Sequence, residues 1–186
     1  KLPAWRESAI RWTFQTGDTI NTPPLVTNRT LLFASHDGSL YSVTLQDRQL
    51  AFQFETDAPI SASLAEEGKS LFLASEDQNL YCLNILNGIV RWRIRTSFPL
   101  VYPVSVLDNE VYLSSKKNGL FQLSAQSGLE QWWQPLGSRF ISLSPTRVYA
   151  TDELGNLLVL SRTDGAILSA VPLRKYQVKL MNEQTD

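Results

Sequence analysis

The sequence is poor in the residues that most often build metal and nucleophile sites. Its 186 residues include one cysteine, Cys82, one histidine, His36, and one methionine. A single cysteine excludes an intramolecular disulfide, and so few Cys and His side chains exclude the paired spacings of zinc sites. A glycine-rich phosphate loop is missing too. We therefore expect no Cys/His metal centre and predict no catalytic residue.

Long apolar runs and an excess of either charge are also missing. No stretch approaches the roughly 18 consecutive apolar residues of a membrane-spanning helix. The 17 basic and 18 acidic residues give a net charge of −1, whereas nucleic-acid-binding proteins usually carry a basic surface. The basic pair Lys116-Lys117 is too small to change this balance. The composition predicts neither a membrane span nor a nucleic-acid partner.

A repeat of 40 residues is the main feature that the sequence does contain. Aromatic side chains recur at this spacing, at Trp12, Phe52, Trp92 and Trp132. A five-residue motif has the same period: Asp-Gly-Ser-Leu-Tyr at 37–41, Asp-Gln-Asn-Leu-Tyr at 77–81 and Lys-Asn-Gly-Leu-Phe at 117–121. A fourth copy, near 148–158, comes three residues early. Self-similarity at about 40 residues indicates a repeat architecture.

Each period contains four short apolar segments separated by turn residues, which is typical of a β-propeller blade. No window keeps the apolar spacing of a helix for long enough to form one. The two middle segments are apolar at nearly every position, as expected for strands covered on both faces. The predicted strands are residues 23–27, 31–35, 40–45, 50–55, 60–65, 71–75, 80–85, 90–95, 102–106, 111–115, 120–124, 130–134, 140–144, 147–151, 157–161 and 167–171.

We predict an all-β fold, a single array of four-stranded antiparallel propeller blades. About four blades are visible, at residues 16–55, 56–95, 96–135 and 136–172. Segments 10–15 and 173–186 match parts of incomplete flanking blades. Because both ends fall within repeats, we expect the chain to be part of a larger propeller of about six to eight blades. Cys82 lies in a predicted strand, so we expect a buried, unreactive thiol.

The repeat resembles that of the PQQ-like, or quinoprotein-like, β-propeller family. Blades of that family carry a tryptophan-docking motif, roughly Ala-x-Asp-x-x-Thr-Gly-Lys-x-x-Trp. Residues 82–92 and 122–132 match the spacing of its glycine and tryptophan. The first copy departs from the motif, with Phe52 in place of tryptophan, and the last keeps Gly165 but ends in Ser169. The resemblance covers nearly the whole chain.

The resemblance implies a structural role for the repeated aromatic and glycine residues. A large ring on an outer strand can pack against the adjacent blade and bury roughly 150–250 Å². Glycine permits the positive φ of the tight turn that precedes that strand. We expect these residues to dock the blades together: Trp12, Phe52, Trp92, Trp132, Gly88, Gly128 and Gly165.

The same resemblance implies several functions. The family includes PQQ- and calcium-dependent dehydrogenases of alcohols and sugars, which usually hold a vicinal cysteine pair that this chain lacks. It also includes assembly scaffolds, such as the lipoprotein of the bacterial outer-membrane barrel-assembly machine, and extracytoplasmic sensor domains. We predict a non-catalytic scaffold without a cofactor that binds a protein partner in the periplasm or elsewhere outside the cytoplasm. The alternatives are a segment of a PQQ-dependent dehydrogenase and a sensor domain.

The candidate contact residues lie on the predicted turns between the second and third strands of each blade. They are His36, Glu76, Asp77, Lys116, Lys117, Asp152 and Glu153. We expect these turns to share one face of the propeller with the loops that connect successive blades, bordered by Phe98, Tyr102 and Arg139. Loops on a rigid scaffold often carry recognition residues, and the mixed charges favour a protein partner.

Other interpretations of the same residues stay open. The acidic pairs Glu76-Asp77 and Asp152-Glu153 could ligate calcium through their oxygens. His36 beside Asp37 could orient a base, although no nucleophile with a motif context accompanies it. A partner strand could also pair with an exposed blade edge.

Overall fold

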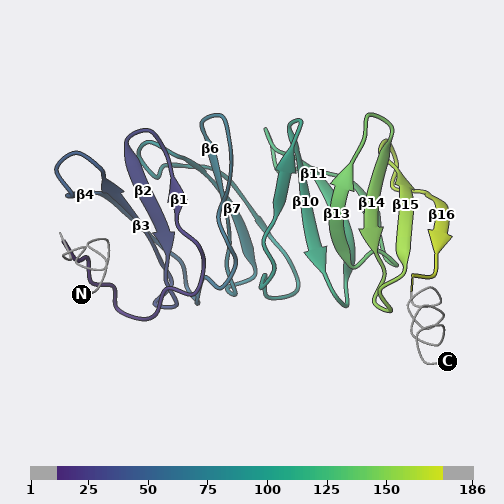
Figure 1. Cartoon of the computed structure of the whole chain (residues 1–186), viewed down its shortest axis with the longest axis horizontal. Coiled ribbons are helices and arrows are strands. Elements are labelled where there is room, and N and C mark those ends of the chain that lie inside the picture. The colour runs from purple at the N-terminus through teal and green to yellow at the C-terminus, as the bar shows by residue number, and fades with distance from the viewer. Residues whose placement is uncertain (1–11, 174–186) are drawn as a thin grey trace, which may run out of the picture.

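Sixteen β-strands make up the regular structure of the chain. The computed structural model describes residues 12–173, which form four antiparallel sheets of four strands. The sheets stand side by side in a row, with β4 near one end and β16 at the other (Figure 1). Within residues 12–173 there is no helix of the length and apolar character needed to cross a membrane. The chain is therefore an all-β propeller-type array, as the sequence predicts.

Each sheet is one blade, and its strands are neighbours in chain order. The strands of blades 1 and 2 are β1 (Leu25–Val26), β2 (Thr30–Ala34), β3 (Ser39–Thr44), β4 (Leu50–Glu55), β5 (Ala65–Glu67), β6 (Ser70–Ala74), β7 (Asn79–Asn84) and β8 (Val90–Arg95). The strands of blades 3 and 4 are β9 (Ser105–Leu107), β10 (Glu110–Ser115), β11 (Gly119–Ser124), β12 (Glu130–Gln134), β13 (Arg139–Leu143), β14 (Arg147–Thr151), β15 (Leu157–Ser161) and β16 (Ile167–Val171).

The first strands of blades 1 to 3 are shorter than predicted. β5 begins at Ala65 rather than at residue 60, and β9 begins at Ser105 rather than at residue 102. The residues before them are buried nonetheless, because Ile60 and Leu100 plug the space between blades. Their backbone N–H groups donate to carbonyls of the preceding blade, Ile60 to Ser35 and Leu100 to Ser75. In these segments, apolar residues in the sequence correctly indicate buried side chains, but they do not indicate which residues pair in a strand.

The hydrophobic core lies between the blades. One cluster joins blades 1 and 2, a second joins blades 2 and 3, and a third joins blades 3 and 4. The middle strand β7 is buried along nearly its whole length, because a neighbouring blade covers each face. β3 is buried to the same extent, with blade 2 on one face and Phe14 packed against Phe33 and Tyr41 on the other. Cys82 in β7 is buried as expected, and burial raises the pKa of its thiol, which makes it a poor nucleophile.

Aromatic rings pack onto glycines of the next blade. A Cβ atom at Gly128 would lie 2.8 Å from Trp92 Cε3, and one at Gly165 would lie 2.5 Å from Trp132 Cε3. Each indole Nε1–H also donates to a carbonyl of that next blade, at 3.0 Å from Ala125 for Trp92 and 3.0 Å from Arg162 for Trp132.

Phe52 takes the same position over Gly88, where a Cβ atom would lie 2.5 Å from Phe52 Cδ2. Gly88, Gly128 and Gly165 all have positive φ, between 70° and 74°. Glycine is therefore required at these positions for two reasons: the turn needs a positive φ, and the aromatic ring leaves no room for a Cβ atom.

Trp12 differs from the other three aromatic positions. It lies outside any strand and its side chain is 37% exposed, whereas Trp132 is 6% exposed. The position one period before Gly88 holds Arg48, which has φ of 62°. This position therefore carries a Cβ atom where the other three have none, and the docking of Trp12 stays a prediction.

The predicted flanking blades are only partly within the described residues. Residues 12–15 form no strand, in contrast to the prediction for 10–15, because no described strand lies beside them. Phe14 instead packs edge-on against Phe33 and Tyr41, with ring centroids 5.4 Å apart in both pairs. Residues 10, 11 and 174–186 lie outside the described residues.

Candidate functional site

The turns and the blade-connecting loops meet at one end of the sheets, which we call the loop face. It comprises turns 35–38, 75–78, 115–118 and 152–156 and connecting loops 56–64 and 96–104. Backbone bonds tie turns to loops: the N–H groups of His36 and Glu76 donate to the carbonyls of Thr19 and Pro59. The repeats therefore bring the predicted turns and loops together on a single surface.

Repeated threonines hold the loops in place. Thr56 Oγ1 donates to the Gly38 and Ala58 carbonyls at 2.9 and 2.7 Å. Thr96 Oγ1 makes the equivalent bonds to Gln78 and Phe98, at 3.0 and 2.6 Å. Buried backbone carbonyls need such partners, and the bonds also fix each loop to the blade before it. The loop face is thus a preformed surface.

The Asp77 side chain is hydrogen-bonded within its turn and is not directed at solvent. Its carboxylate accepts hydrogen bonds from Tyr81 Oη at 2.6 Å, from the Asn79 backbone at 2.8 Å and from the Asp57 backbone at 3.3 Å. Burial acts to raise the pKa of Asp77, but these hydrogen bonds outweigh it and hold that pKa below its ordinary value. Burial and the Asp77 carboxylate raise the pKa of Tyr81 to about 12, so Tyr81 remains a donor.

Blade 1 has the same arrangement, and in blade 4 the aspartate bonds within its own turn. Asp37 accepts from Tyr41 Oη at 2.8 Å, and Asp152 accepts from the Asn156 backbone and amide at 2.8 and 2.7 Å. The Asp37 carboxylate is therefore directed at Tyr41, and no hydrogen bond joins it to His36 within the described residues. Glu153 is exposed beside Asp152. Asp77 and Asp152 thus maintain their turns, whereas Glu153 is free to contact a partner.

His36 and Glu76 come together across the junction of blades 1 and 2. His36 Nε2 lies 3.2 Å from Asn21 Nδ2 and 3.4 Å from Ser61 Oγ. Ser61 Oγ in turn donates to the Glu76 carboxylate. The result is a continuous polar cluster, half-buried and internally hydrogen-bonded. Sequence reasoning missed Asn21 and Ser61, although they sit one period apart and each follows a repeated apolar residue, Ile20 and Ile60.

Blade 3 breaks this polar pattern. Val101 occupies the position of Asn21 and Ser61, and Lys116-Lys117 replace Glu76-Asp77 one period later. Val101 is 45% exposed, and both lysines are exposed. The charge of the turn is therefore reversed relative to blade 2, and an apolar side chain takes the place of the polar cluster.

A hollow of about 390 Å³ lies at this break. Its lining joins the loop 96–104 to the turn 115–118: Phe98, Pro99, Val101, Tyr102, Ser114, Ser115, Lys116, Lys117 and Asn118. Behind the lining, Phe98 packs on Phe121, which stacks on Trp133. The hollow offers an apolar floor with two ammonium groups at its rim. It brings together four residues that the sequence analysis places on this face, Phe98, Tyr102, Lys116 and Lys117.

The acidic pairs proposed as calcium ligands do not assemble into one site. Between residues 12 and 173, no three His, Cys, Asp or Glu side chains are grouped in a way that could hold a metal ion. Glu76 and Asp77 face different partners, Ser61 and Tyr81 respectively. Arg139, expected to border the face, is exposed at the start of β13.

Comparison with known proteins identifies the repeat. The family model described as outer membrane protein assembly factor BamB matches residues 4–168. No curated protein sequence gives a significant match. The structure of BamB from Moraxella catarrhalis is similar, with a TM-score of 0.69 at 15% identity, covering 81% of this chain and 48% of that one.

Two enzymes share the fold as well. A europium-containing methanol dehydrogenase has a TM-score of 0.68 at 12% identity, covering 87% of this chain and 43% of that one. A quinohemoprotein alcohol dehydrogenase from Pseudomonas putida has a TM-score of 0.68 at 10% identity, covering 84% and 34%. The chain therefore spans less than half the length of each of these three structures. At such identities the likeness concerns the fold alone.

Proposed function

Because the chain belongs to the PQQ-like repeat family of the outer membrane protein assembly factor BamB, we propose that it is a non-catalytic scaffold that binds a partner protein through the loop face. The observation that carries this proposal is the blade 3 hollow, where an apolar floor and two lysines are left open on a preformed surface. Apolar pockets with a charged rim suit protein side chains. The family resemblance also favours a location outside the cytoplasm.

Site-directed photo-crosslinking tests this proposal in cells. A photoreactive phenylalanine analogue replaces Val101 on the loop face or, as a control, Leu129, which is 66% exposed in the loop between β11 and β12. We expect a discrete crosslinked species from position 101 only. Its yield should fall several-fold when Lys116→Glu and Lys117→Glu are added, because the reversed charges repel an acidic partner surface. A crosslink from position 129 that is equal in partner and yield would contradict the assignment.

The PQQ-like fold also occurs in the two dehydrogenases, so cofactor binding is tested separately. We propose that the chain uses no cofactor; its single cysteine leaves it without the vicinal cysteine pair that PQQ-dependent dehydrogenases usually hold. The measurement adds PQQ and calcium, follows the quinone absorbance, and assays dye reduction with alcohols and glucose. An absorbance shift accompanied by turnover would replace the scaffold proposal with an enzyme. Fractionation of cells expressing the protein checks its location.

A further inference from the structure

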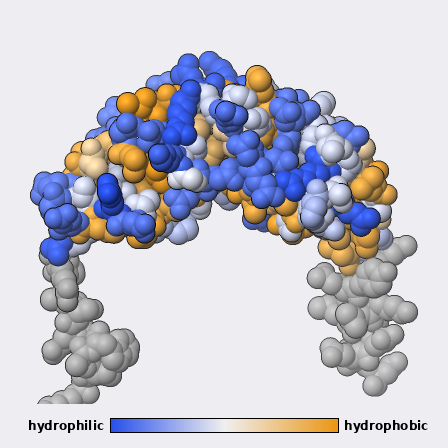
Figure 2. Space-filling model, turned by 90° about the horizontal axis from the view of Figure 1, so that it is seen from above, coloured by the Kyte–Doolittle hydropathy of each residue, from blue (hydrophilic) through white to orange (hydrophobic). Residues whose placement is uncertain are grey.

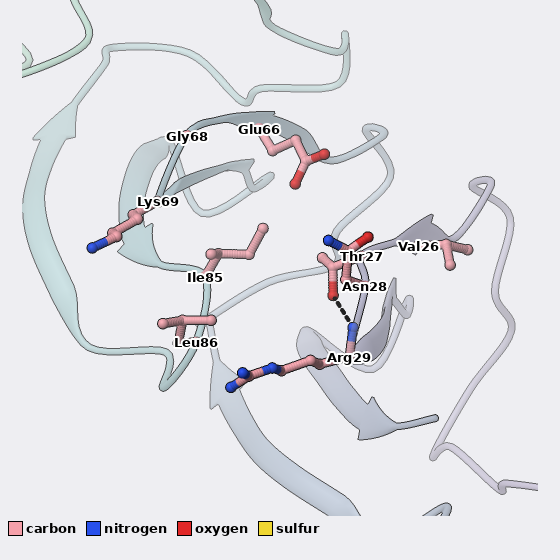
Figure 3. A pocket seen from close by; sticks show the side chains of 9 residues that line it. All are labelled: Val26, Thr27, Asn28, Arg29, Glu66, Gly68, Lys69, Ile85 and Leu86. Atoms are coloured by element: carbon pink, nitrogen blue, oxygen red, sulfur yellow. Dashed lines mark hydrogen bonds between the residues drawn. The ribbon is translucent and has the colours of Figure 1, made fainter. Parts of the chain in front are cut away.

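A second hollow lies at the other end of the sheets, between blades 1 and 2 (Figure 3). It has a volume of about 510 Å³ and is separate from the loop face. Arg29 comes from the turn between β1 and β2, and Glu66 and Lys69 come from β5 and the turn that follows it. Ile85 and Leu86, which follow β7, face the first turn across the hollow. Figure 2 shows this end of the molecule, where hydrophilic and hydrophobic side chains are interspersed.

The equivalent groove between blades 3 and 4 is filled by the protein itself. Arg162 Nε lies 2.9 Å from Glu110 Oε2, and Arg162 Nη2 lies 3.0 Å from Asp108 Oδ2. Arg162 also donates to the Ser144 carbonyl at 3.2 Å. The cation of blade 4 thus spans the groove and pairs with the acidic turn of blade 3.

Backbone hydrogen bonds show which residues correspond between the two grooves. The Arg162 N–H donates to the Thr146 carbonyl at 3.1 Å, and the Ile85 N–H donates to the Lys69 carbonyl at 3.1 Å. Ile85 therefore stands where Arg162 stands two blades later. Asn28 and Thr30 correspond in the same way to Asp108 and Glu110, two periods of 40 residues later. The groove between blades 1 and 2 therefore has neither the cation nor the carboxylates of this ion pair, and it remains open.

The open groove keeps an excess of positive charge. Among the side chains that line the groove, Arg29 and Lys69 are cationic and exposed, and Glu66 is the one carboxylate; Arg29 also borders an adjoining hollow that Asp47 lines. The Arg29 guanidinium makes no ion pair with any residue between 12 and 173. Two large apolar side chains lie beside these charges, Val26 at 60% and Leu86 at 62% exposure.

From this combination we propose that the groove binds a segment of a partner protein in which an acidic side chain neighbours a leucine-sized apolar one. The carboxylate pairs with Arg29, which has no partner among the described carboxylates, and Lys69 adds to the attraction. The apolar side chain packs on Ile85 and Leu86. The site is independent of the loop face, so either site can exist without the other.

A peptide titration followed by backbone amide NMR tests the site. The probe is acetyl-Leu-Glu-Leu-Glu-Leu-amide, and the matched control peptide carries Gln in place of Glu. We expect shift changes at the amides of Arg29, Lys69 and Leu86. The Gln peptide should bind about three- to tenfold more weakly, since each exposed ion pair contributes modestly. Added salt should weaken the Glu peptide only.

Two charge-reversal variants decide where the peptide binds. Arg29→Glu should weaken binding at least about threefold, whereas Lys117→Glu, the same kind of change on the loop face, should leave it unaltered. Both side chains are exposed, and circular dichroism verifies that both variants fold. The proposal fails if millimolar peptide shifts none of these amides, if both peptides bind equally, or if Lys117→Glu weakens binding as much as Arg29→Glu. Failure here leaves the crosslinking result at position 101 unaffected.

Discussion

At the scale of single residues, glycine and tryptophan are matched across blades. The spacing from Gly88 to Trp92 within one period is visible in the sequence. The ring of Trp92, however, covers Gly128 of the next blade rather than the glycine of its own. The spacing within one motif therefore does not identify the glycine that each ring covers.

Alanine substitutions separate the two demands on glycine. Gly68 has φ of +61° and nothing within 4 Å of an added Cβ, so Gly68→Ala should cost only the left-handed conformation, about 1–2 kcal/mol. Gly128→Ala carries the same conformational cost plus an overlap with the Trp92 ring, for an added loss of about 1–3 kcal/mol. Urea denaturation of both variants measures the difference. Equal losses would show that the ring does not constrain Gly128.

At the scale of the element, the turn between the second and third strands of blades 1 and 2 is built around an aspartate. Asp37 and Asp77 each accept hydrogen bonds from a tyrosine four residues later and from a backbone N–H 20 residues earlier. The Asp-x-x-x-Tyr spacing is legible in the sequence, but the bond to the preceding loop is a contact between blades. For that reason Asp77 is predicted as a contact residue, while in the structure its carboxylate holds the turn.

The stabilisation by Asp77 should depend on pH. Its pKa is lowered from 3.8 in the folded state, so its contribution is complete above the unfolded-state pKa and is lost as the pH falls through the folded-state pKa. Asp77→Asn should therefore destabilise the protein at pH 7, and the difference from the parent should shrink below about pH 4. Urea midpoints across this range give the result.

Glu153→Gln is the control for this series. Glu153 is exposed and its carboxylate forms no hydrogen bond with residues 12–173, so we expect midpoints that follow the parent at every pH. A gap between the parent and Asp77→Asn that stays constant from pH 7 to pH 3 would count against the proposed role of the carboxylate.

At the scale of the whole molecule, stability resides in the junctions between blades. Three apolar clusters each join two neighbouring sheets, so each blade depends directly on its neighbours only. Such arrays behave nearly as a sum of repeats and junctions. The loop face gains its form from the same junctions, because each connecting loop is bonded to the blade before it.

Damage at one junction should therefore remain local. Trp132 is 6% exposed and packs in the cluster of blades 3 and 4, so Trp132→Ala should cost about 3–5 kcal/mol there. Amide hydrogen exchange should show faster exchange in β14 and β15 and unchanged exchange in β3. Trp133→Ala, at a residue that is 51% exposed, should have a smaller effect. Equal acceleration in β3 would indicate a single cooperative unit.

The sequence by itself determined the period, the strand content and the blade architecture. The 40-residue spacing of Phe52, Trp92 and Trp132 and the doubly apolar middle strands suffice for this, since both follow from local patterns that every blade repeats. The sequence also placed Lys116 and Lys117 in the turn between the second and third strands of blade 3, where the structure has them. These features are periodic, and a period is visible without coordinates.

Only the tertiary structure decided what lies between the blades. One example is the hydrogen-bonded link from His36 through Ser61 to Glu76, which joins residues of different repeats. The exposure of Trp12 and the open groove beside Arg29 likewise depend on which side chains of other repeats lie nearby. The physical reason is that such contacts depend on the distance between neighbouring sheets. A periodic sequence states what each blade contains, whereas the packing of the sheets determines which side chains meet and which grooves stay open.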